Sequence, residues 1–306
     1  SWEPMTVIMD MNEYGGRPED ENGIGDPAVL VDKETNTIWV AALWISGKKD
    51  QRAWNASGPG MDPEETGQFM LVKSEDDGLT WSEPINVTAQ MKKPEWRLFF
   101  NGPGKGISMK DGTLVFAAQF RDAEGVPHST IVYSKDKGET WHVGTGAKSN
   151  TTEAQVVELA DGSLMLNMRD NRNHPNSGDH DGLHGRSVAI TKDLGKTWEE
   201  HPTSRKALPE STCMASIISA NLPEYGEVLF FSNPNSTTDR SKMTIKASTD
   251  QGMTWPEEYQ LELYENDGFG YSCMTMIDET HVGILYEGVR DLYFEKVPIS
   301  EILGNE

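Results

Sequence analysis

The segment Ser74-Glu75-Asp76-Asp77-Gly78-Leu79-Thr80-Trp81 decides the fold of this 306-residue chain, because its pattern recurs. The pattern is Ser/Thr-x-Asp-x-Gly-x-Thr-Trp, and further copies occupy residues 134–141, 191–198 and 248–255. The copies start at 74, 134, 191 and 248, so their spacings are 60, 57 and 57 residues. Such a period, with several short strands in each unit, indicates the blades of a β-propeller.

Each copy predicts a tight turn that closes a β-hairpin. The Asp side chain accepts hydrogen bonds from turn amides, and the Gly supplies a backbone φ that other residues resist. The Trp is expected to pack back over the hairpin and to be substantially buried. The role of the repeat is therefore predicted to be structural.

Composition supports an all-β chain with many short elements. Further strands are expected at residues 37–42, 113–119, 155–159, 163–168, 228–232 and 282–286, and a single helical turn at 299–303. The formal net charge of −22 argues against a nucleic-acid partner, and no apolar run is long enough to span a membrane. Any site for an anion must then be a local cluster of arginines.

The four segments resemble the Asp boxes of bacterial exo-sialidases, and the resemblance extends over essentially the whole chain. It looks closest to the sialidases of Bacteroides-type gut bacteria, notably through residues 96–119 and 164–169. The resemblance implies an all-β, six-bladed β-propeller of the sialidase type with Asp-box hairpins, in one domain over residues 1–306. Asp boxes also occur in other propellers, so the chemistry needs residues of its own.

The resemblance implies a tyrosine nucleophile. Sialic acid carries a carboxylate on its anomeric carbon, so a carboxylate nucleophile would be repelled, whereas a neutral phenol activated by a nearby Glu would not. Sialidases are the known exception to the two-carboxylate scheme of glycosidases. The segment Gly270-Tyr271-Ser272-Cys273 looks like the nucleophile segment, which implies Tyr271. Glu153, within Thr151-Thr152-Glu153-Ala154-Gln155, is similar to the Glu that pairs with it.

The substrate carboxylate needs guanidinium groups, whose planar fork of donors fits a carboxylate. By resemblance these are Arg169 and Arg240, while Glu287 orients a clamp arginine. Weaker matches to pocket segments of the family imply that Asp26, Gln119 and Thr152 bind the substrate. Arg172 and Arg186 are interpreted as structural or surface groups.

The family also has an upstream Arg-Ile-Pro segment with a third clamp arginine, and an acid/base Asp after it. Neither can be matched in this sequence. Because Ser1-Trp2-Glu3-Pro4 resembles the end of a further repeat, the chain is expected to lack the N-terminal strands of the propeller.

No cofactor motif is present. The glycines of residues 102–106 are not followed by the Lys-Ser/Thr of a phosphate loop, and His174, His180 and His184 lie in a Gly/Asp-rich loop without regular metal-ligand spacing. Cys213 and Cys273 are expected to be two buried thiols in strands.

The expected activity is hydrolysis of terminal sialic acid from sialylated glycans, in a periplasmic or secreted enzyme. The alternatives are a non-catalytic carbohydrate-binding propeller, a trans-sialidase or dehydrating sialidase of the same fold, and a purely structural interaction propeller.

Overall fold

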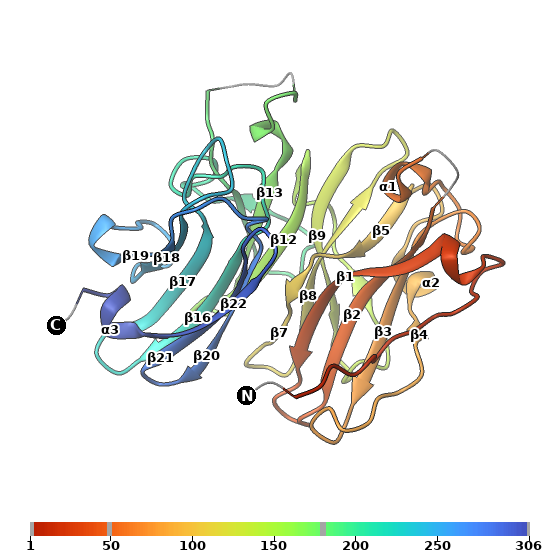
Figure 1. Ribbon diagram of the computed structural model, residues 1–306, viewed down its shortest axis with the longest axis horizontal. Helices are drawn as coiled ribbons and strands as arrows, with labels where there is room; N and C mark the ends of the chain where they lie inside the picture. The colour runs from red at the N-terminus through yellow and green to blue at the C-terminus, as the bar shows by residue number, and fades with distance from the viewer. Residues whose placement is uncertain (1–2, 48–50, 178–181, 305–306) are drawn as a thin grey trace. The chain divides into compact units, whose positions relative to one another are not determined.

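The computed structural model describes residues 3–47, 51–177 and 182–304. The chain divides into two compact units, Ser1–Val143 and Gly144–Glu306, and each is described by itself. Nearly all the regular secondary structure in the described part of both units is β-strand (Figure 1). No described helix is long and apolar enough to cross a membrane.

The first unit contains two sheets. Its strands and helices are η1 (Glu19–Glu21), β1 (Asn22–Val31), β2 (Ile38–Ser46), α1 (Ala53–Ala56), β3 (Gln68–Ser74), β4 (Ile85–Asn86), α2 (Thr88–Met91), β5 (Leu98–Asn101), β6 (Gly104–Lys105), β7 (Ile107–Ser108), β8 (Leu114–Arg121), β9 (Pro127–Ser134) and β10 (His142–Val143). The first sheet has the order β4-β3-β2-β1-β6, and the second has β10-β9-β8-β5 with β7 also paired to β8. All these pairs are antiparallel except β1–β6.

The second unit contains three sheets. Its elements are β11 (Lys148–Ser149), β12 (Thr151–Glu158), β13 (Leu164–Asp170), η2 (Asn171–Asn173), β14 (Ser187–Thr191), β15 (Glu199–Glu200), β16 (Ser216–Leu222), β17 (Gly226–Pro234), β18 (Met243–Ser248), η3 (Glu257–Tyr259), β19 (Gln260–Tyr264), β20 (Ser272–Asp278), β21 (His281–Glu287), β22 (Leu292–Pro298) and α3 (Ile299–Ile302). The sheets β12-β13-β14-β15, β16-β17-β18-β19 and β20-β21-β22 follow the order of the chain. This antiparallel meander is typical of a propeller blade. The strands and the helical turn predicted from sequence are confirmed.

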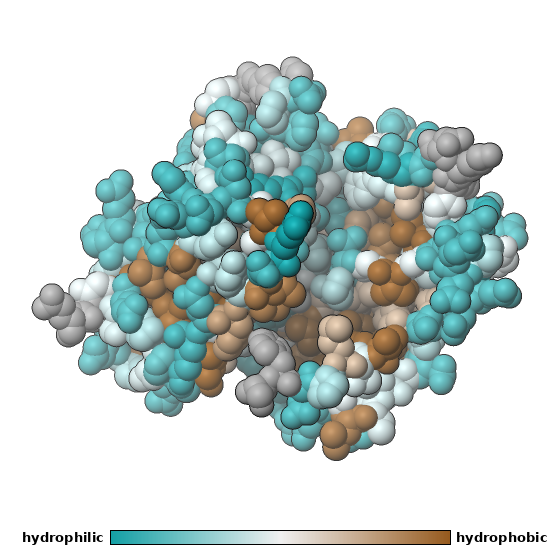
Figure 2. All heavy atoms as spheres, in the orientation of Figure 1, coloured by the Kyte–Doolittle hydropathy of each residue, from teal (hydrophilic) through white to brown (hydrophobic). Residues whose placement is uncertain are grey.

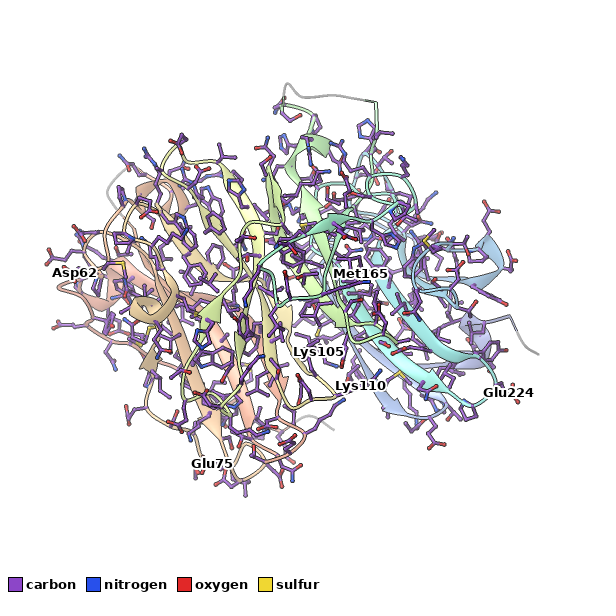
Figure 3. The ribbon with its side chains drawn as sticks, turned by 180° about the vertical axis from the view of Figure 1, so that it is seen from behind. Asp62, Glu75, Lys105, Lys110, Met165 and Glu224 are labelled. Atoms are coloured by element: carbon purple, nitrogen blue, oxygen red, sulfur yellow. The ribbon has the colours of Figure 1, made fainter. Side chains whose placement is uncertain are left out.

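The four repeats form one and the same turn, each between two paired antiparallel strands. In the first, the Thr80 N–H donates to Asp76 Oδ1 at 2.8 Å, and the Gly78 N–H donates to Ser74 Oγ at 2.8 Å. Gly78 has a φ of 85°, which explains why the repeat requires glycine there. Glu75, labelled in Figure 3, is an exposed residue of this turn.

The tryptophans of the repeats differ in burial. Trp141 is 2 % exposed because it packs edge-on against Trp39, with ring centroids 6.1 Å apart. Trp81, Trp198 and Trp255 are half-buried. The expectation of substantial burial therefore holds fully for one of the four.

Apolar side chains pack between neighbouring sheets of each unit. In the second unit, Val157, Met165 and Ile217 belong to one cluster, and Phe230, Ile245 and Ile284 belong to another. Hydrophilic residues cover much of the face shown in Figure 2, in keeping with the net charge of −22.

The expectation of six blades needs correction, because the described residues form five sheets. The last sheet has three strands, and residues 3–21 contribute a 3-10 turn and an isolated bridge between Tyr14 and Arg17.

Candidate active site

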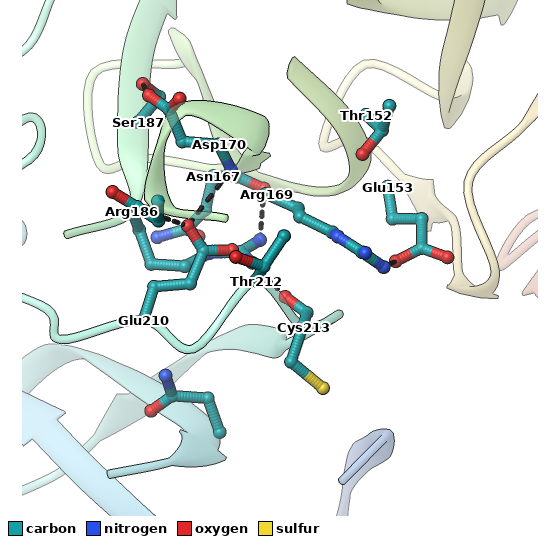
Figure 4. A network of polar contacts seen from close by, with 12 residues as sticks. Thr152, Glu153, Asn167, Arg169, Asp170, Arg186, Ser187, Glu210, Thr212 and Cys213 are labelled. Atoms are coloured by element: carbon teal, nitrogen blue, oxygen red, sulfur yellow. Dashed lines mark hydrogen bonds and ion pairs between the residues drawn. The ribbon is translucent and has the colours of Figure 1, made fainter. Parts of the chain in front are cut away.

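A β-bulge presents Glu153. Strand β12 pairs with β13 through Thr152 opposite Arg169 and Ala154 opposite Met168, so Glu153 is the extra residue between two pairs. A bulge bends its strand and re-aims a side chain, and bulges are frequent next to active sites. The bulge places the carboxylate of Glu153 beside the guanidinium of Arg169, which comes from the neighbouring strand (Figure 4).

Glu153, Arg169 and Tyr271 form a closed set of contacts. The Tyr271 hydroxyl donates to Glu153 Oε1, and Arg169 Nη1 donates to Glu153 Oε2 at 2.6 Å. Arg169 Nη1 also lies 3.3 Å from the Tyr271 oxygen. The geometric expectation that a carboxylate oxygen of Glu153 lies within hydrogen-bond reach of the Tyr271 hydroxyl is confirmed.

The electrostatics of this set keep Tyr271 neutral. Burial raises the pKa of Tyr271, the Glu153 carboxylate raises it further, and Arg169 only partly opposes them. Burial alone would lower the pKa of Arg169, but Glu153, Tyr271 and Glu210 together more than offset this, and the pKa is raised. The site therefore holds a protonated phenol next to a carboxylate and a permanent cation.

The backbone of Tyr271 is fixed from both sides. Its N–H donates to Glu287 Oε2 at 3.2 Å, and its carbonyl accepts from the Glu287 N–H at 3.0 Å. Gly270 precedes it with a φ of 82°, where a Cβ would come within 2.8 Å of Pro234 Cγ. The two hydrogen bonds join Glu287 to the backbone of Tyr271, and its expected role in orienting a clamp arginine stays a prediction.

Arg240 lies against the Tyr271 ring. Its Cζ is 5.6 Å from the ring centroid, a distance typical of a cation–π contact. Nη1 donates to the Phe269 carbonyl at 2.8 Å, and Nη2 donates to the Thr212 carbonyl at 2.9 Å. Two backbone carbonyls thus hold the guanidinium beside Tyr271.

A buried ion pair contacts the strand that carries Arg169. Arg186 Nη1 is 2.8 Å from Glu210 Oε1, and neither side chain is exposed. Glu210 Oε2 accepts a hydrogen bond from the Asp170 N–H at 3.0 Å (Figure 4). It also accepts one from Asn173 Nδ2 at 2.6 Å. The interpretation of Arg186 as a structural group fits this position, although nothing in the sequence pointed to Glu210 as its partner.

A cavity of about 320 Å³ borders Arg169. Its lining residues all have polar or charged side chains: Asn150, Arg169, Asn171, Arg172, His174, Ser177 and Thr212. Arg172 is held by Asp170 through Nε to Oδ1 at 2.8 Å and Nη2 to Oδ2 at 2.7 Å. The Thr152 hydroxyl donates to Asn171 Oδ1 at 3.3 Å, so Thr152 links Glu153 to this polar wall.

Two predicted residues belong to the first unit. Asp26 also lies at a β-bulge, between Gly25 and Ala28, with a φ of 52° and its carbonyl accepting from Asn101 Nδ2 at 2.5 Å. Gln119 is buried in β8, and neither amide atom has a hydrogen-bond partner among the described residues. Their roles in binding stay predictions.

The cysteines and histidines of the second unit differ partly from expectation. Cys213 is buried but lies in a loop, not a strand, and Cys273 in β20 is only half-buried. Burial raises the pKa of the Cys213 thiol to about 12. His180 lies outside the described residues, and the described part of the chain contains no group of His, Cys, Asp and Glu that could hold a metal ion.

Comparison with known proteins gives a consistent set of relatives. Residues 1–284 match the family model described as a BNR repeat-like domain. A sialidase of Bacteroides fragilis is 52% identical over 99% of this chain and 55% of its own length. A sialidase of Clostridium perfringens is 31% identical over 83% of this chain and 70% of its own.

A solved structure described as a Hadza microbial sialidase superposes with a TM-score of 0.92 at 51% identity. The match covers 99% of this chain and 57% of that one. This chain therefore spans a little over half the length of that structure and of the Bacteroides fragilis relative.

Proposed function

Because this chain belongs to the sialidase family, with a BNR repeat-like domain in a propeller-like all-β fold, we propose that it is the catalytic part of an exo-α-sialidase. The contact of the Tyr271 hydroxyl with Glu153, next to Arg169, is the observation that supports this function most directly. The substrates are sialylated glycans, and the enzyme acts in the periplasm or outside the cell, where such glycans occur.

Tyr271 acts as the nucleophile and Glu153 as its base. The Tyr271 oxygen attacks the anomeric carbon while Glu153 accepts the phenol proton and the glycosidic bond breaks. The raised pKa of Tyr271 means that the phenol needs such a base at neutral pH. In the second step water attacks the anomeric carbon, the bond to Tyr271 breaks, and the phenol recovers its proton from Glu153. Two displacements at one carbon retain its configuration.

The substrate carboxylate binds to the arginines. Arg169 and Arg240 both lie beside Tyr271, one through its hydroxyl and the other against its ring. A third arginine and the acid that protonates the leaving oxygen, and later deprotonates the attacking water, lie in the full-length protein outside this chain. Asp26, Gln119 and Thr152 contact the sugar, and Glu287 holds Tyr271 in place.

The covalent intermediate provides the test. A fluorinated sialic acid with a good leaving group forms the intermediate but hydrolyses slowly, so the full-length protein incubated with it should gain the mass of one sugar. Peptide mass spectrometry should locate the adduct on Tyr271. An adduct on another residue would refute the nucleophile, and absence of both adduct and released sialic acid would refute the activity.

The product distinguishes hydrolysis from its rivals. We expect free sialic acid from a natural sialoside. Sialic acid transferred to an acceptor sugar, or an anhydro product, would instead indicate a trans-sialidase or a dehydrating enzyme.

A further inference from the structure

Arg186 and Glu210 bind groups that in turn hold Arg169, Arg240 and Tyr271 in place. In the described part of the chain, the pair itself forms no hydrogen bond with any of these three residues. We propose that this pair is a positioning unit, which sets the directions of Arg169 and Arg240 toward one point beside Tyr271. The inference rests on the proposed sialidase function and adds residues to it.

The first step concerns Arg169. Arg186 Nε donates to Asn167 Oδ1 at 2.7 Å, and Glu210 Oε2 accepts from the Asp170 N–H at 3.0 Å. Asn167 lies two residues before Arg169 and Asp170 directly after it, at the end of β13. The pair thus holds the strand on both sides of Arg169 (Figure 4). The backbone direction from which the guanidinium reaches Glu153 is fixed in this way.

The second step concerns Arg240. Besides its contact with Glu210, Arg186 Nη1 donates to the Cys213 carbonyl at 2.5 Å, so the pair holds both ends of the segment 210–213. Between these ends Thr212 has a φ of 56°, which a β-branched residue rarely adopts, and its carbonyl accepts from Arg240 Nη2. A backbone in this conformation persists only where its surroundings impose it. Here the two anchored ends impose it, and the result is a carbonyl aimed at Arg240.

The third step concerns Tyr271. The Cys213 thiol lies 3.3 Å from the Gly270 carbonyl, which directly precedes Tyr271 in the chain. The segment 210–213 therefore contacts Arg240 directly and also contacts Gly270, the residue before Tyr271. One buried pair connects three residues that come from three different parts of the sequence.

The free-energy cost of burying two charges argues that the Arg186–Glu210 pair serves to position the clamp arginines and not to stabilise the fold. Removing two charges from water costs free energy that their attraction often fails to recover, and apolar replacements of similar volume are frequently neutral or stabilising. Burial raises the pKa of Glu210, against the opposing effect of Arg186, which reflects this cost. An apolar pair could fill the same space, but it could not hold Asn167, Asp170 and the Cys213 carbonyl.

The decisive variant is the double replacement Arg186→Met with Glu210→Leu in the full-length protein. We expect its thermal unfolding midpoint to fall, because the Asp170 N–H, the Asn173 amide and the Cys213 carbonyl lose buried partners. In the folded protein, kcat/KM for an aryl sialoside should fall at least about 100-fold, since small misplacements of binding groups have effects of that size. The Kd of a non-hydrolysable sialic acid analogue should rise at least about tenfold, because both arginines bind its carboxylate.

Two further variants keep the test independent of folding. Asn167→Leu leaves both charges in place and removes one hydrogen bond of Arg186. We therefore expect a smaller fall in kcat/KM and a smaller rise in Kd than in the double variant. Lys92→Met is the matched control: Lys92 is a buried cation of the first unit whose ammonium donates to the carbonyls of Gly60 and Trp96. It should lower the unfolding midpoint and leave kcat/KM of the folded protein unchanged.

The outcomes separate the two proposals. A wild-type protein without sialidase activity would refute the proposed function. An active wild type with a folded double variant of equal kcat/KM and equal Kd, or with an unchanged Asn167→Leu variant, would overturn the positioning role.

Discussion

Tyr271 and Glu153 are 118 residues apart in the chain and share a hydrogen bond, so the Glu153 carboxylate should govern the protonation of Tyr271. We predict that Glu153→Gln lowers the pKa of Tyr271 while burial keeps it above the ordinary value of about 10. The wild-type phenol therefore stays protonated to a higher pH than that of the variant. Ultraviolet absorbance against pH, with the matching Tyr271→Phe protein subtracted, measures this. An equal or higher pKa in Glu153→Gln would contradict the proposed electrostatics.

A second prediction at this scale separates chemistry from binding. Tyr271→Phe should lower kcat by at least about 10³-fold, as removal of a nucleophile does, and leave the Kd of a sialic acid analogue nearly unchanged. Tyr286→Phe is a matched control, since the Tyr286 hydroxyl also donates to a carboxylate, that of Glu295 at 2.5 Å. It should retain turnover. Loss of binding in Tyr271→Phe with turnover kept would remove the nucleophile assignment.

The repeat turn is the element that recurs most regularly, and its Asp should matter for stability alone. The Thr254 N–H donates to Asp250 Oδ1 at 2.9 Å, and the Thr254 and Ser248 hydroxyls also donate to this carboxylate. We predict that Asp250→Ala lowers the free energy of unfolding by about 1–3 kcal/mol, as expected for hydrogen bonds to a charged group. Thr249→Ala, in the same turn at an exposed position, should change it little.

The effect of Asp250→Ala should depend on pH. Burial raises the pKa of Asp250, but the hydrogen bonds from Thr254, Ser248 and Met253 together outweigh it, and the pKa lies below its ordinary value. The carboxylate therefore stabilises the fold above that ordinary value, about pH 4, and the contribution is lost as the pH falls further. Denaturant unfolding at several pH values measures the difference, and kcat/KM should not change. A loss of activity without a loss of stability would argue against a purely structural turn.

Strand β18 carries a buried lysine that should destabilise the sheet in acid. Lys246 is 1 % exposed, its ammonium donates to Asn235 Oδ1 at 2.8 Å, and burial lowers its pKa to about 7. Below that pH the folded state must hold a buried charge, and the cost is relieved as the pH rises toward the unfolded-state value of about 10.5. The stabilisation gained by Lys246→Met should therefore shrink by about 2–3 kcal/mol between about pH 6 and pH 9. A gain independent of pH would refute this.

At the scale of the whole molecule, this chain matches only part of the length of its relatives, and residues outside the match can contribute to activity. The last sheet exposes Leu285, Leu292 and Phe294, which are 36%, 67% and 51% exposed. Apolar side chains on one sheet favour association when nothing covers them. We propose that other residues of the full-length protein cover this face, and that they also supply the third arginine and the acid.

The corresponding prediction compares residues 1–306 with the full-length protein. We expect kcat/KM of the shorter chain on natural sialosides to be lower by at least about 10²-fold, because general acid catalysis alone contributes about 10² to 10⁴. An aryl sialoside, whose leaving group needs little protonation, should show a smaller difference. Equal activity of the two proteins on natural sialosides would show that the acid and third arginine lie within residues 1–306.

The sequence by itself determined the repeats, their turns and most strands, because those features depend on neighbours in the chain. The bonds from Gly78 to Ser74 and from Thr80 to Asp76 each span four residues, so their residue types reveal them. Resemblance in sequence order also indicated Glu153, Arg169, Arg240 and Tyr271, and the fold brings these four together.

The tertiary structure alone decided what depends on distant partners. The bulge that aims Glu153 arises from the register between β12 and β13, and register is a property of two strands together. Arg186 and Glu210 are 24 residues apart. Because charged residues are mostly exposed in proteins, the sequence alone favours a surface position for both. The carbonyl of Thr212 that holds Arg240 is a backbone group, which every residue possesses, so no sequence pattern marks it.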